Sequence, residues 1–435
     1  MLNTTKVLTR SALFLAAALS LPACDLLTVD NPNNIVEESL ANVQAATAIV
    51  NGAEALVAQG HGHMIGPYAT LADELFWIGS RDAWFSLDQG FMKDPANEFV
   101  DEAFPSVNEG RWMADLAVSS LEGFVADDPS NADLKVQLAR ANLLAGISYM
   151  FIGAMFEDFV FSNKKEAGVP VGPGNMASVL TSAVGYLDAA VNNSTGDLNL
   201  RATAARARAK WELAAWSKQN SPSPSSPLVS DGGADSDALA AIGAAGGVTA
   251  DWRDQFTYAA AQVSNILAGW VNERSEMQWG ERYVTNGKPD AINDITGIAL
   301  LDPIDGVGAP YVQRFIVDEF SSGTNYSSLT ITSTRRMHLQ LAESALASGD
   351  DAGFATHINH VRAMDGLSPY TGGSDMAQLQ YERQANLIME ASRLGDLYRF
   401  GIESDNWLGT SEAVAQPGSF LPITNIEILA NPNIG

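Results

Sequence analysis

Apolar residues recur every three or four positions over most of this sequence, which places them on one face of an α-helix. Residues 36–59 follow this spacing throughout, with apolar positions at Val36, Leu40, Val43, Ala46, Val50, Ala53 and Val57. The same period predicts helices at about 132–157, 177–191, 200–218 and 252–272. Strand-like alternation is scarce, and residues 311–317 are its best short example. The pattern therefore predicts a mostly helical protein with little β-structure.

The clearest pair of helices lies at residues 333–364, where two apolar stripes flank a turn at Gly349-Asp350. A helix pair of this kind buries its stripe only by stacking on neighbouring pairs, as in tetratricopeptide repeats. Residues 177–218, and the helix near 133–157 with its neighbour, look like degenerate relatives of the same unit. We therefore expect a mostly all-α fold of tetratricopeptide-like helix pairs that form a curved scaffold with loop-rich inserts.

Residues 220–250 interrupt this pattern. The segment is rich in Pro, Ser, Gly and Ala, a composition that favours loops over packed structure. We expect a flexible insert here, between a helical region at 24–219 and a C-terminal region at 251–435 that contains the helix pair.

The N-terminus carries a short apolar run followed by the only cysteine in the sequence. Lys6 and Arg10 lead into this run, which is typical of a secretory signal peptide. Residues 21–24, Leu-Pro-Ala-Cys, resemble the bacterial lipobox, whereas the alternative is an ordinary secretory signal with a chance cysteine. We expect residues 1–23 to be removed and Cys24 to carry a lipid anchor, in which each buried methylene adds about 0.8 kcal/mol.

The charge of the chain limits its partners. Residues 1–23 contain two basic and no acidic residues, so their removal changes the formal charge from −26 to −28. Such a chain lacks the clustered basic residues of a nucleic-acid surface, and it is repelled by anionic lipid. No apolar run after the signal peptide approaches the roughly 18 residues of a transmembrane helix. We therefore expect a globular body in an aqueous, extracytoplasmic space.

Several motifs in order suggest a family. The stretches VDNPNNI, ATAIVNGAEAL and LADELFW follow the lipobox, and RMHLQLAESALASGDDAGFATHINHVRAMDGL, ERQANLIMEASRLGDLYRFG and LPITNIEILANPNI follow in the C-terminal half. Together they resemble the SusD/RagB outer-membrane lipoproteins. The resemblance covers both ends of the mature chain and is weak between about 160 and 330.

This resemblance implies a non-enzymatic nutrient-binding subunit without a cofactor. Such a subunit caps a SusC-like TonB-dependent transporter barrel, captures oligosaccharide or sometimes peptide, and delivers it as the lid closes. It implies a lipid anchor at Cys24 and a location on the cell outer membrane, facing outward. Asp25 directly follows the cysteine and leaves the membrane leaflet open.

Charges alternate in sign along one predicted helix near the C-terminus, at Glu382, Arg383, Glu390, Arg393, Asp396 and Arg399. Opposite charges three or four positions apart attract on a helix, so a solvated or inter-helix ionic stripe explains them. The resemblance implies that this helix, with Arg362, fastens the C-terminal region to the helical scaffold. We therefore keep these residues out of the binding site.

The first candidate binding cluster is ELFWIGSRDAWFSLDQGF. A sugar binder needs exposed aromatic rings for the apolar sugar face, beside carboxylate, amide and guanidinium groups for the hydroxyls. We expect Phe76 and Trp77 to pack inward, and we select Arg81, Asp82 and Trp84 as ligand candidates.

The second cluster, MQWGERYVTNGKPD, lies in a polar loop beyond a predicted helix, where binding residues of helical scaffolds tend to lie. It contributes Trp279, Arg282 and Tyr283. In both clusters we expect the rings to stack on the sugar and the charged groups to hydrogen-bond to hydroxyls or to an acidic sugar.

Other chemistry has weaker support. His357 and His360 could supply two metal ligands, but HINH lacks the glutamate of zinc proteases, so we expect a surface or packing role and no metal site. His61-Gly62-His63 is expected in a loop. The acids Asp231, Asp235 and Asp237 miss the spacing of an EF-hand, although loose calcium binding stays open.

Two further functions stay open. A glycoside hydrolase needs only two carboxylates about 5–9.5 Å apart, although no motif singles out an acid and a base, and we expect no catalytic residue. A periplasmic repeat adaptor would bind protein partners through a concave helical face.

The lipobox predicts that mass spectrometry of the N-terminal peptide from the cell envelope finds Cys24 as the first residue, with its thiol joined to lipid. Cys24→Ser removes the only thiol that can accept the lipid, so we expect this variant in the soluble fraction. An unmodified Cys24 in the natural protein would contradict the anchor.

Overall fold

The computed structural model describes residues 42–163, 165–285, 295–321 and 325–434. Cys24 and residues 36–41 lie outside this range. A 3-10 turn at Val43–Ala45 belongs to a short N-terminal unit, and the elements considered below lie in the unit Ala46–Gly435.

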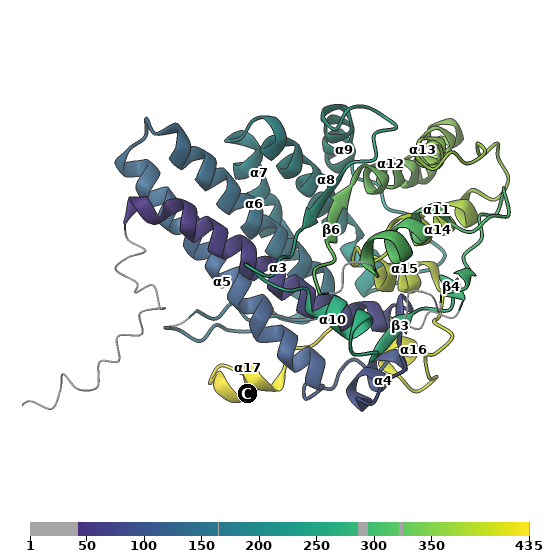
Figure 1. Ribbon diagram of the computed structural model, residues 1–435, viewed down its shortest axis with the longest axis horizontal. Coiled ribbons are helices and arrows are strands. Elements are labelled where there is room, and N and C mark those ends of the chain that lie inside the picture. The colour runs from purple at the N-terminus through teal and green to yellow at the C-terminus, as the bar shows by residue number, and fades with distance from the viewer. Residues whose placement is uncertain (1–41, 164, 286–294, 322–324, 435) are drawn as a thin grey trace, which may run out of the picture. The chain divides into compact units, whose positions relative to one another are not determined.

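Long helices pack side by side in chain order through the first half of this unit (Figure 1). They are α3 (Ala46–Leu71), α5 (Glu98–Asp127), α6 (Ala132–Met155), α7 (Ala177–Asn192), α8 (Gly196–Asn220) and α9 (Gly232–Ala244). The row continues through α12 (Thr334–Ser348), which packs on α9, to α13 (Asp351–Met364). This architecture confirms the expected fold class of stacked helix pairs.

Glycine allows α3 and α5 to approach closely. A Cβ atom on Gly60 would lie 2.8 Å from the carbonyl oxygen of Ser106, and one on Gly110 would lie 2.7 Å from that of Leu56. Both contacts are with backbone, which cannot move aside cheaply. The two helices therefore depend on these positions having no side chain.

Local capping explains where several predicted helices begin and end. The side chain of Asn131 accepts hydrogen bonds from the backbone N–H groups of Asp133 and Leu134 at the start of α6. In the α12–α13 pair, Gly349 ends α12 with a φ of 75°, which favours glycine, and the Asp350 side chain accepts from the Gly353 N–H. The predicted pair at 333–364 is confirmed.

The segment 220–250 contains the helix α9, which corrects the prediction of a flexible insert. Asp231 caps this helix through the N–H of Ala234, and alanine is the strongest helix former. Ala238 and Ile242 then pack with Met337 of α12 in one core cluster. This segment, whose composition favours a loop, therefore forms a helix that packs within the helical row.

Two other sequence predictions are wrong. The helix predicted at 252–272 is instead strand β2 (Arg253–Phe256), followed by a loop and the short helix α10 (Ile266–Asn272). The strand predicted at 311–317 is helical, as α11 (Pro310–Gln313) and a π-helix η4 (Arg314–Phe320). Pairing with β6 (Leu329–Ser333), far along the chain, determines the conformation of β2.

The remaining elements are short. Two more antiparallel strand pairs join β1 (Leu75–Trp77) to β3 (Met277–Trp279) and β4 (Val284–Thr285) to β5 (Gly297–Ile298). The other helices are α4 (Asp82–Asp88), η2 (Pro173–Asn175), α14 (Asp375–Asn386), α15 (Arg393–Phe400), α16 (Glu412–Ala415) and α17 (Asn425–Ala430).

The charged motif at 382–399 is two helices rather than one, with a break between α14 and α15. Its charges are buried and ion-paired. Arg399 and Arg383 both reach Glu343 of α12, and Arg383 also pairs with Asp396 at 2.8 Å. Glu390, in the break, pairs with Arg336 of α12 at 2.7 Å. These contacts fasten the C-terminal helices to the helical row.

The helix α6 is long and apolar enough to cross a membrane, which corrects the expectation that no later run approaches this length. Within its most apolar stretch, 78% of the residues are buried inside the protein, as in a core helix.

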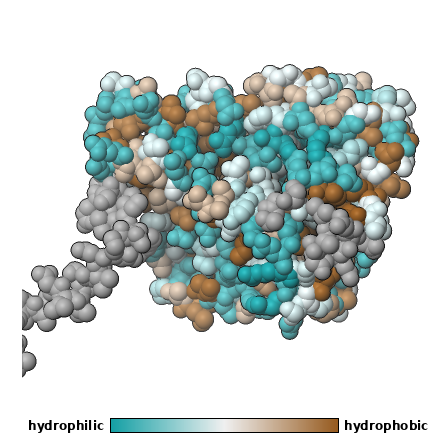
Figure 2. Space-filling model, viewed as in Figure 1, coloured by the Kyte–Doolittle hydropathy of each residue, from teal (hydrophilic) through white to brown (hydrophobic). Residues whose placement is uncertain are grey.

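The face shown in Figure 2 is mostly hydrophilic, with apolar residues in separate patches.

Burial of the Glu343 carboxylate yields a stability prediction. Glu343→Gln keeps an acceptor for the Val229 N–H but leaves Arg383 and Arg399 without this charge, so we expect a loss of about 3–5 kcal/mol in the free energy of unfolding. Urea denaturation measures it. Glu98→Gln, which breaks the exposed pair with Arg81, is the control and should cost at most about 1 kcal/mol. Equal losses in both variants would contradict the buried network.

Glu74 yields a pH prediction. Burial raises the pKa of its carboxyl from 4.5 to about 8, so the folded protein retains a proton that the unfolded chain releases. The free energy of unfolding should therefore fall as pH rises from 4.5 to 8, by up to about 1.4 kcal/mol per pH unit. Glu74→Gln removes this dependence and keeps the acceptor for the Met389 N–H.

The check is urea denaturation at pH 5, 6, 7 and 8. The variant should gain stability over the natural protein as pH rises, whereas Glu122→Gln, which changes an exposed carboxyl on α5, should not. A constant difference between Glu74→Gln and the natural protein at all four pH values would contradict the prediction.

Candidate ligand-binding site

The strand pair β1–β3 brings the two sequence-predicted binding clusters together. Phe76 lies opposite Gln278 in the antiparallel register. Just beyond the strands, the Glu276 carboxylate accepts hydrogen bonds from the backbone N–H groups of Ser80 at 2.9 Å and Arg81 at 3.2 Å. Segments far apart in the sequence therefore share one region of the surface.

A hollow of about 90 Å³ opens beside this strand pair. It is lined by Asp73, Phe76, Gly280, Glu281, Arg282, Ser404, Asp405 and Asn406. The lining includes one aromatic ring among carboxylate, guanidinium, amide and hydroxyl groups. Asp73 has a φ of 60°, a strained backbone conformation for a residue other than glycine.

Arg282 is held rigidly at the hollow. Its Nε and Nη2 donate to the two carboxylate oxygens of Asp405 at 2.9 and 2.7 Å, and its Nη1 donates to Asp73 at 3.0 Å. The hydrogen bond with Asp405 raises the pKa of Arg282, and the same bond lowers the pKa of Asp405. Both groups therefore keep their charges, and the planar guanidinium is fixed in orientation.

The side-chain amide of Asn406 is held by a hydrogen bond to α4. Its Nδ2 donates to Asp88 of α4 at 3.0 Å, and burial raises the pKa of Asp88 to about 6. The C-terminal loop that carries Asp405 and Asn406 is therefore tied to α4, which is part of the first candidate cluster.

Arg81 lies at a second hollow, of about 280 Å³, lined also by Glu98, Phe99, Glu102, Ile266, Trp270, Arg274 and Glu276. Arg81 pairs with Glu98, and both side chains are about half exposed. Asp82 is exposed in the first turn of α4. The three charged residues selected from sequence, Arg81, Asp82 and Arg282, thus reach the surface.

The three aromatic candidates do not reach the surface, which corrects their prediction as ligand-stacking residues. Trp84, Trp279 and Tyr283 are each 0% exposed, so none offers a ring face to a ligand. Trp84 stacks on Phe99 at 3.9 Å between ring centroids, and Trp279 meets Phe320 edge-on at 5.1 Å. Their large apolar area stabilises the core instead.

Sequence reasoning also missed the aromatic rings that do reach solvent. Phe76 and Trp77, expected to pack inward, are both half-buried, and Phe85 is 40% exposed. The rings of Trp77 and Phe85 lie 4.9 Å apart. Trp84 and Phe85 are adjacent on α4, so only one of them can face the core, and the structure buries the larger ring.

The two carboxylates nearest to Arg282 at the hollow are engaged with guanidinium groups. A glycosidase needs one carboxylic acid that holds its proton, with a raised pKa. Asp405 has a lowered pKa, and Asp73 is held between Arg282 and Arg393 at 3.0 and 2.9 Å. Both carboxylates therefore accept hydrogen bonds in this structure.

No protein-family sequence model and no curated protein sequence matches this chain. Solved structures do. A SusD superfamily protein from Bacteroides thetaiotaomicron matches with a TM-score of 0.63 at 14% identity, over 91% of this chain and 98% of that one. For one from Parabacteroides distasonis the values are 0.61, 12%, 90% and 98%.

A SusD-like carbohydrate binding protein from Bacteroides vulgatus matches with a TM-score of 0.53 at 11% identity, over 82% of this chain and 83% of that one. Likeness at such low identities concerns the fold, and it covers 82–91% of this chain in the three structures. The fold that the sequence motifs implied is confirmed: this protein has the fold of the SusD superfamily.

Proposed function

We propose that this protein binds oligosaccharide in the hollow beside Arg282. The observation that carries the proposal is the half-buried ring of Phe76 beside the hydrogen-bonding groups of Arg282, Asp405 and Asn406. An aromatic ring can cover the apolar face of a sugar while fixed polar groups meet its hydroxyls. The structural neighbour described as carbohydrate binding supports this ligand class.

The ligand is a neutral rather than an acidic glycan. Around the hollow, the single guanidinium of Arg282 faces the carboxylates of Asp73, Glu281 and Asp405. The excess of negative charge, on a chain whose formal charge is −26, repels carboxylated or sulfated sugars. Arg81 and Asp82 are proposed as further contacts where a longer chain extends past Glu276.

We also propose that the bound glycan passes to a SusC-like TonB-dependent transporter barrel at the outer membrane, where the lipid on Cys24 holds the protein facing outward. The SusD-superfamily fold and the lipobox support this step. Co-purification of a long barrel receptor from native membranes would test it, and recovery of a soluble envelope protein instead would favour a repeat adaptor.

The binding site predicts a pair of sensitive positions. Phe76→Ala removes the ring that covers the sugar face, and Arg282→Gln removes the guanidinium that orders the carboxylates of Asp405 and Asp73 and offers its remaining N–H to the ligand, a charged hydrogen bond worth about 1.5–3 kcal/mol. We expect each change to weaken binding of a neutral oligosaccharide about tenfold or more. Calorimetry with a ligand first identified on a glycan array measures this.

Arg140→Gln is the matched control. Arg140 also bridges two acceptors, Glu54 and Asn51, but lies on α6 outside the lining of the hollow, so its loss should leave glycan affinity unchanged. Natural affinity in both Phe76→Ala and Arg282→Gln would rule out this hollow. Turnover of the oligosaccharide by the natural protein would show an enzyme instead, and binding of peptides alone would show a peptide receptor.

A further inference from the structure

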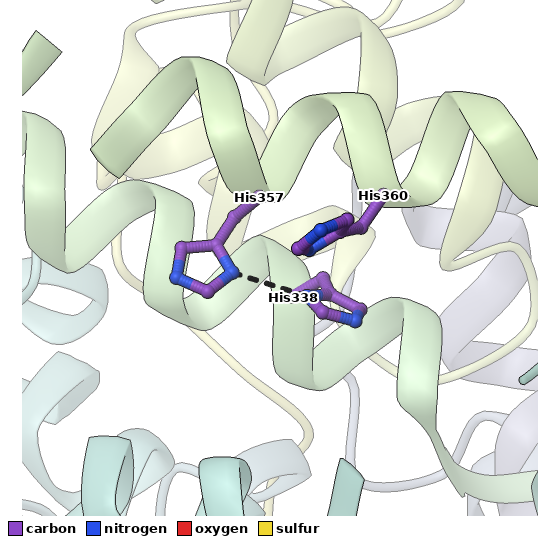
Figure 3. Close-up of side chains that lie close together, drawn as sticks. All are labelled: His338, His357 and His360. Carbon is purple, nitrogen blue, oxygen red and sulfur yellow. Dashed lines mark hydrogen bonds between the residues drawn. The ribbon is translucent and has the colours of Figure 1, made fainter. Parts of the chain in front are cut away.

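Three of the five histidines in the chain converge between α12 and α13. His338 projects from α12, and His357 and His360 project from α13 toward it (Figure 3). One ring nitrogen from each lies within 4.8 Å of the others. The pair α12–α13 thus gathers three imidazoles, with no role in the hollow beside Arg282.

Hydrogen bonding within the protein does not account for this cluster. Nδ1 of His338 and Nδ1 of His357 lie 3.1 Å apart, a contact that one shared proton can satisfy. Nδ1 of His360 is buried without a hydrogen-bond partner among the described residues, whereas the His338 ring also meets the backbone of Val248, which raises its pKa. A buried imidazole nitrogen without a partner is costly unless another group meets it.

Burial favours the neutral form of the three rings. It lowers the pKa of each of them. The neighbouring rings lower the pKa of His338 further, while Asp350 acts in the opposite direction on His357.

One pair of ring nitrogens has nearly the spacing of two ligands on a tetrahedral ion. With metal–nitrogen bonds of about 2.0–2.1 Å, two imidazole nitrogens on a tetrahedral ion lie roughly 3.3–3.4 Å apart. The His338–His357 contact of 3.1 Å is close to that value. His360 must move closer, and both it and His357 are only half-buried, so their side chains have room to turn.

We propose that His338, His357 and His360 bind one divalent transition-metal ion of the zinc class, with a fourth position open to water. Three neutral imidazoles favour zinc, copper or nickel over calcium and magnesium, which prefer oxygen ligands. Because the ligands come from both helices, the ion joins α12 to α13. The ion therefore stabilises the helix pair at the end that lies away from the turn at Gly349.

The sequence contains part of this signal. His357 and His360, three apart on one helix, have a spacing that can supply two metal ligands. In a helix pair that turns at Gly349, residues at similar distances before and after the turn lie opposite each other. His338, eleven positions before the turn, is the one histidine of α12 that can meet the pair on α13.

The test uses the full mature chain without an affinity histidine tag, stripped of metal by a chelator. Calorimetric titration with zinc chloride should show one equivalent bound, and cobalt(II) should give the visible absorption bands of a tetrahedral nitrogen site. The thermal midpoint of the folded protein should rise with added zinc, because the ion binds the folded state.

His357→Gln and His360→Gln decide the site, since these half-buried positions can be changed without opening the core. Each should weaken zinc binding at least about tenfold, while the midpoint of the metal-free protein stays unchanged. His63→Gln, on α3, removes another histidine and should leave zinc binding unchanged. Zinc affinity retained in both α13 variants, or binding without a defined stoichiometry, would overturn the proposal.

Discussion

A buried carboxylate must meet a buried guanidinium, and this requirement organises the C-terminal half of the protein. Glu343 of α12 receives Arg399 and Arg383 from two later helices, and all three side chains are nearly inaccessible to solvent. Both guanidinium groups also lie over the ring of Trp211 on α8, at 5.4 and 4.7 Å. Since an unpaired buried charge is very costly, α14 and α15 can occupy only the position that satisfies these contacts.

The same requirement fixes the break between α14 and α15. Glu390 must meet Arg336, and Arg393 must meet Asp73, so the short segment between the helices is pulled into an unusual path. Met389 and Ala391 have φ values of 58° and 54° there, which costs energy that the ion pairs offset. Asp73, itself strained, then links Arg393 in the core to Arg282 at the hollow. The geometry of the candidate site is therefore inherited from the buried network.

How much of this could be predicted from the sequence depends on the range of the interaction. The start of α6 and the α12–α13 pair follow from caps and apolar spacing within a few residues. The strands β1 and β2 depend on partners β3 and β6 much later in the chain, and no local pattern reveals such pairing. The aromatic candidates failed for a related reason: on a helix as short as α4, spacing cannot decide whether Trp84 or Phe85 faces inward. The exposure of the charged candidates was easier to predict, because the guanidinium groups of Arg81 and Arg282 need either an ion-pair partner or water.

The buried polar groups of the C-terminal region are of two kinds. In the network around Glu343, each guanidinium meets a carboxylate, and that complementarity is sufficient to explain the residues structurally. The imidazoles of α12 and α13 lie on the same helix pair but face one another, without a hydrogen-bonded carboxylate among the described residues. Apart from the one contact between His338 and His357, these rings offer each other little, whereas imidazole nitrogens are good ligands for a metal cation. A rule that accounts for the arginines as structure thus singles out the histidines as a site.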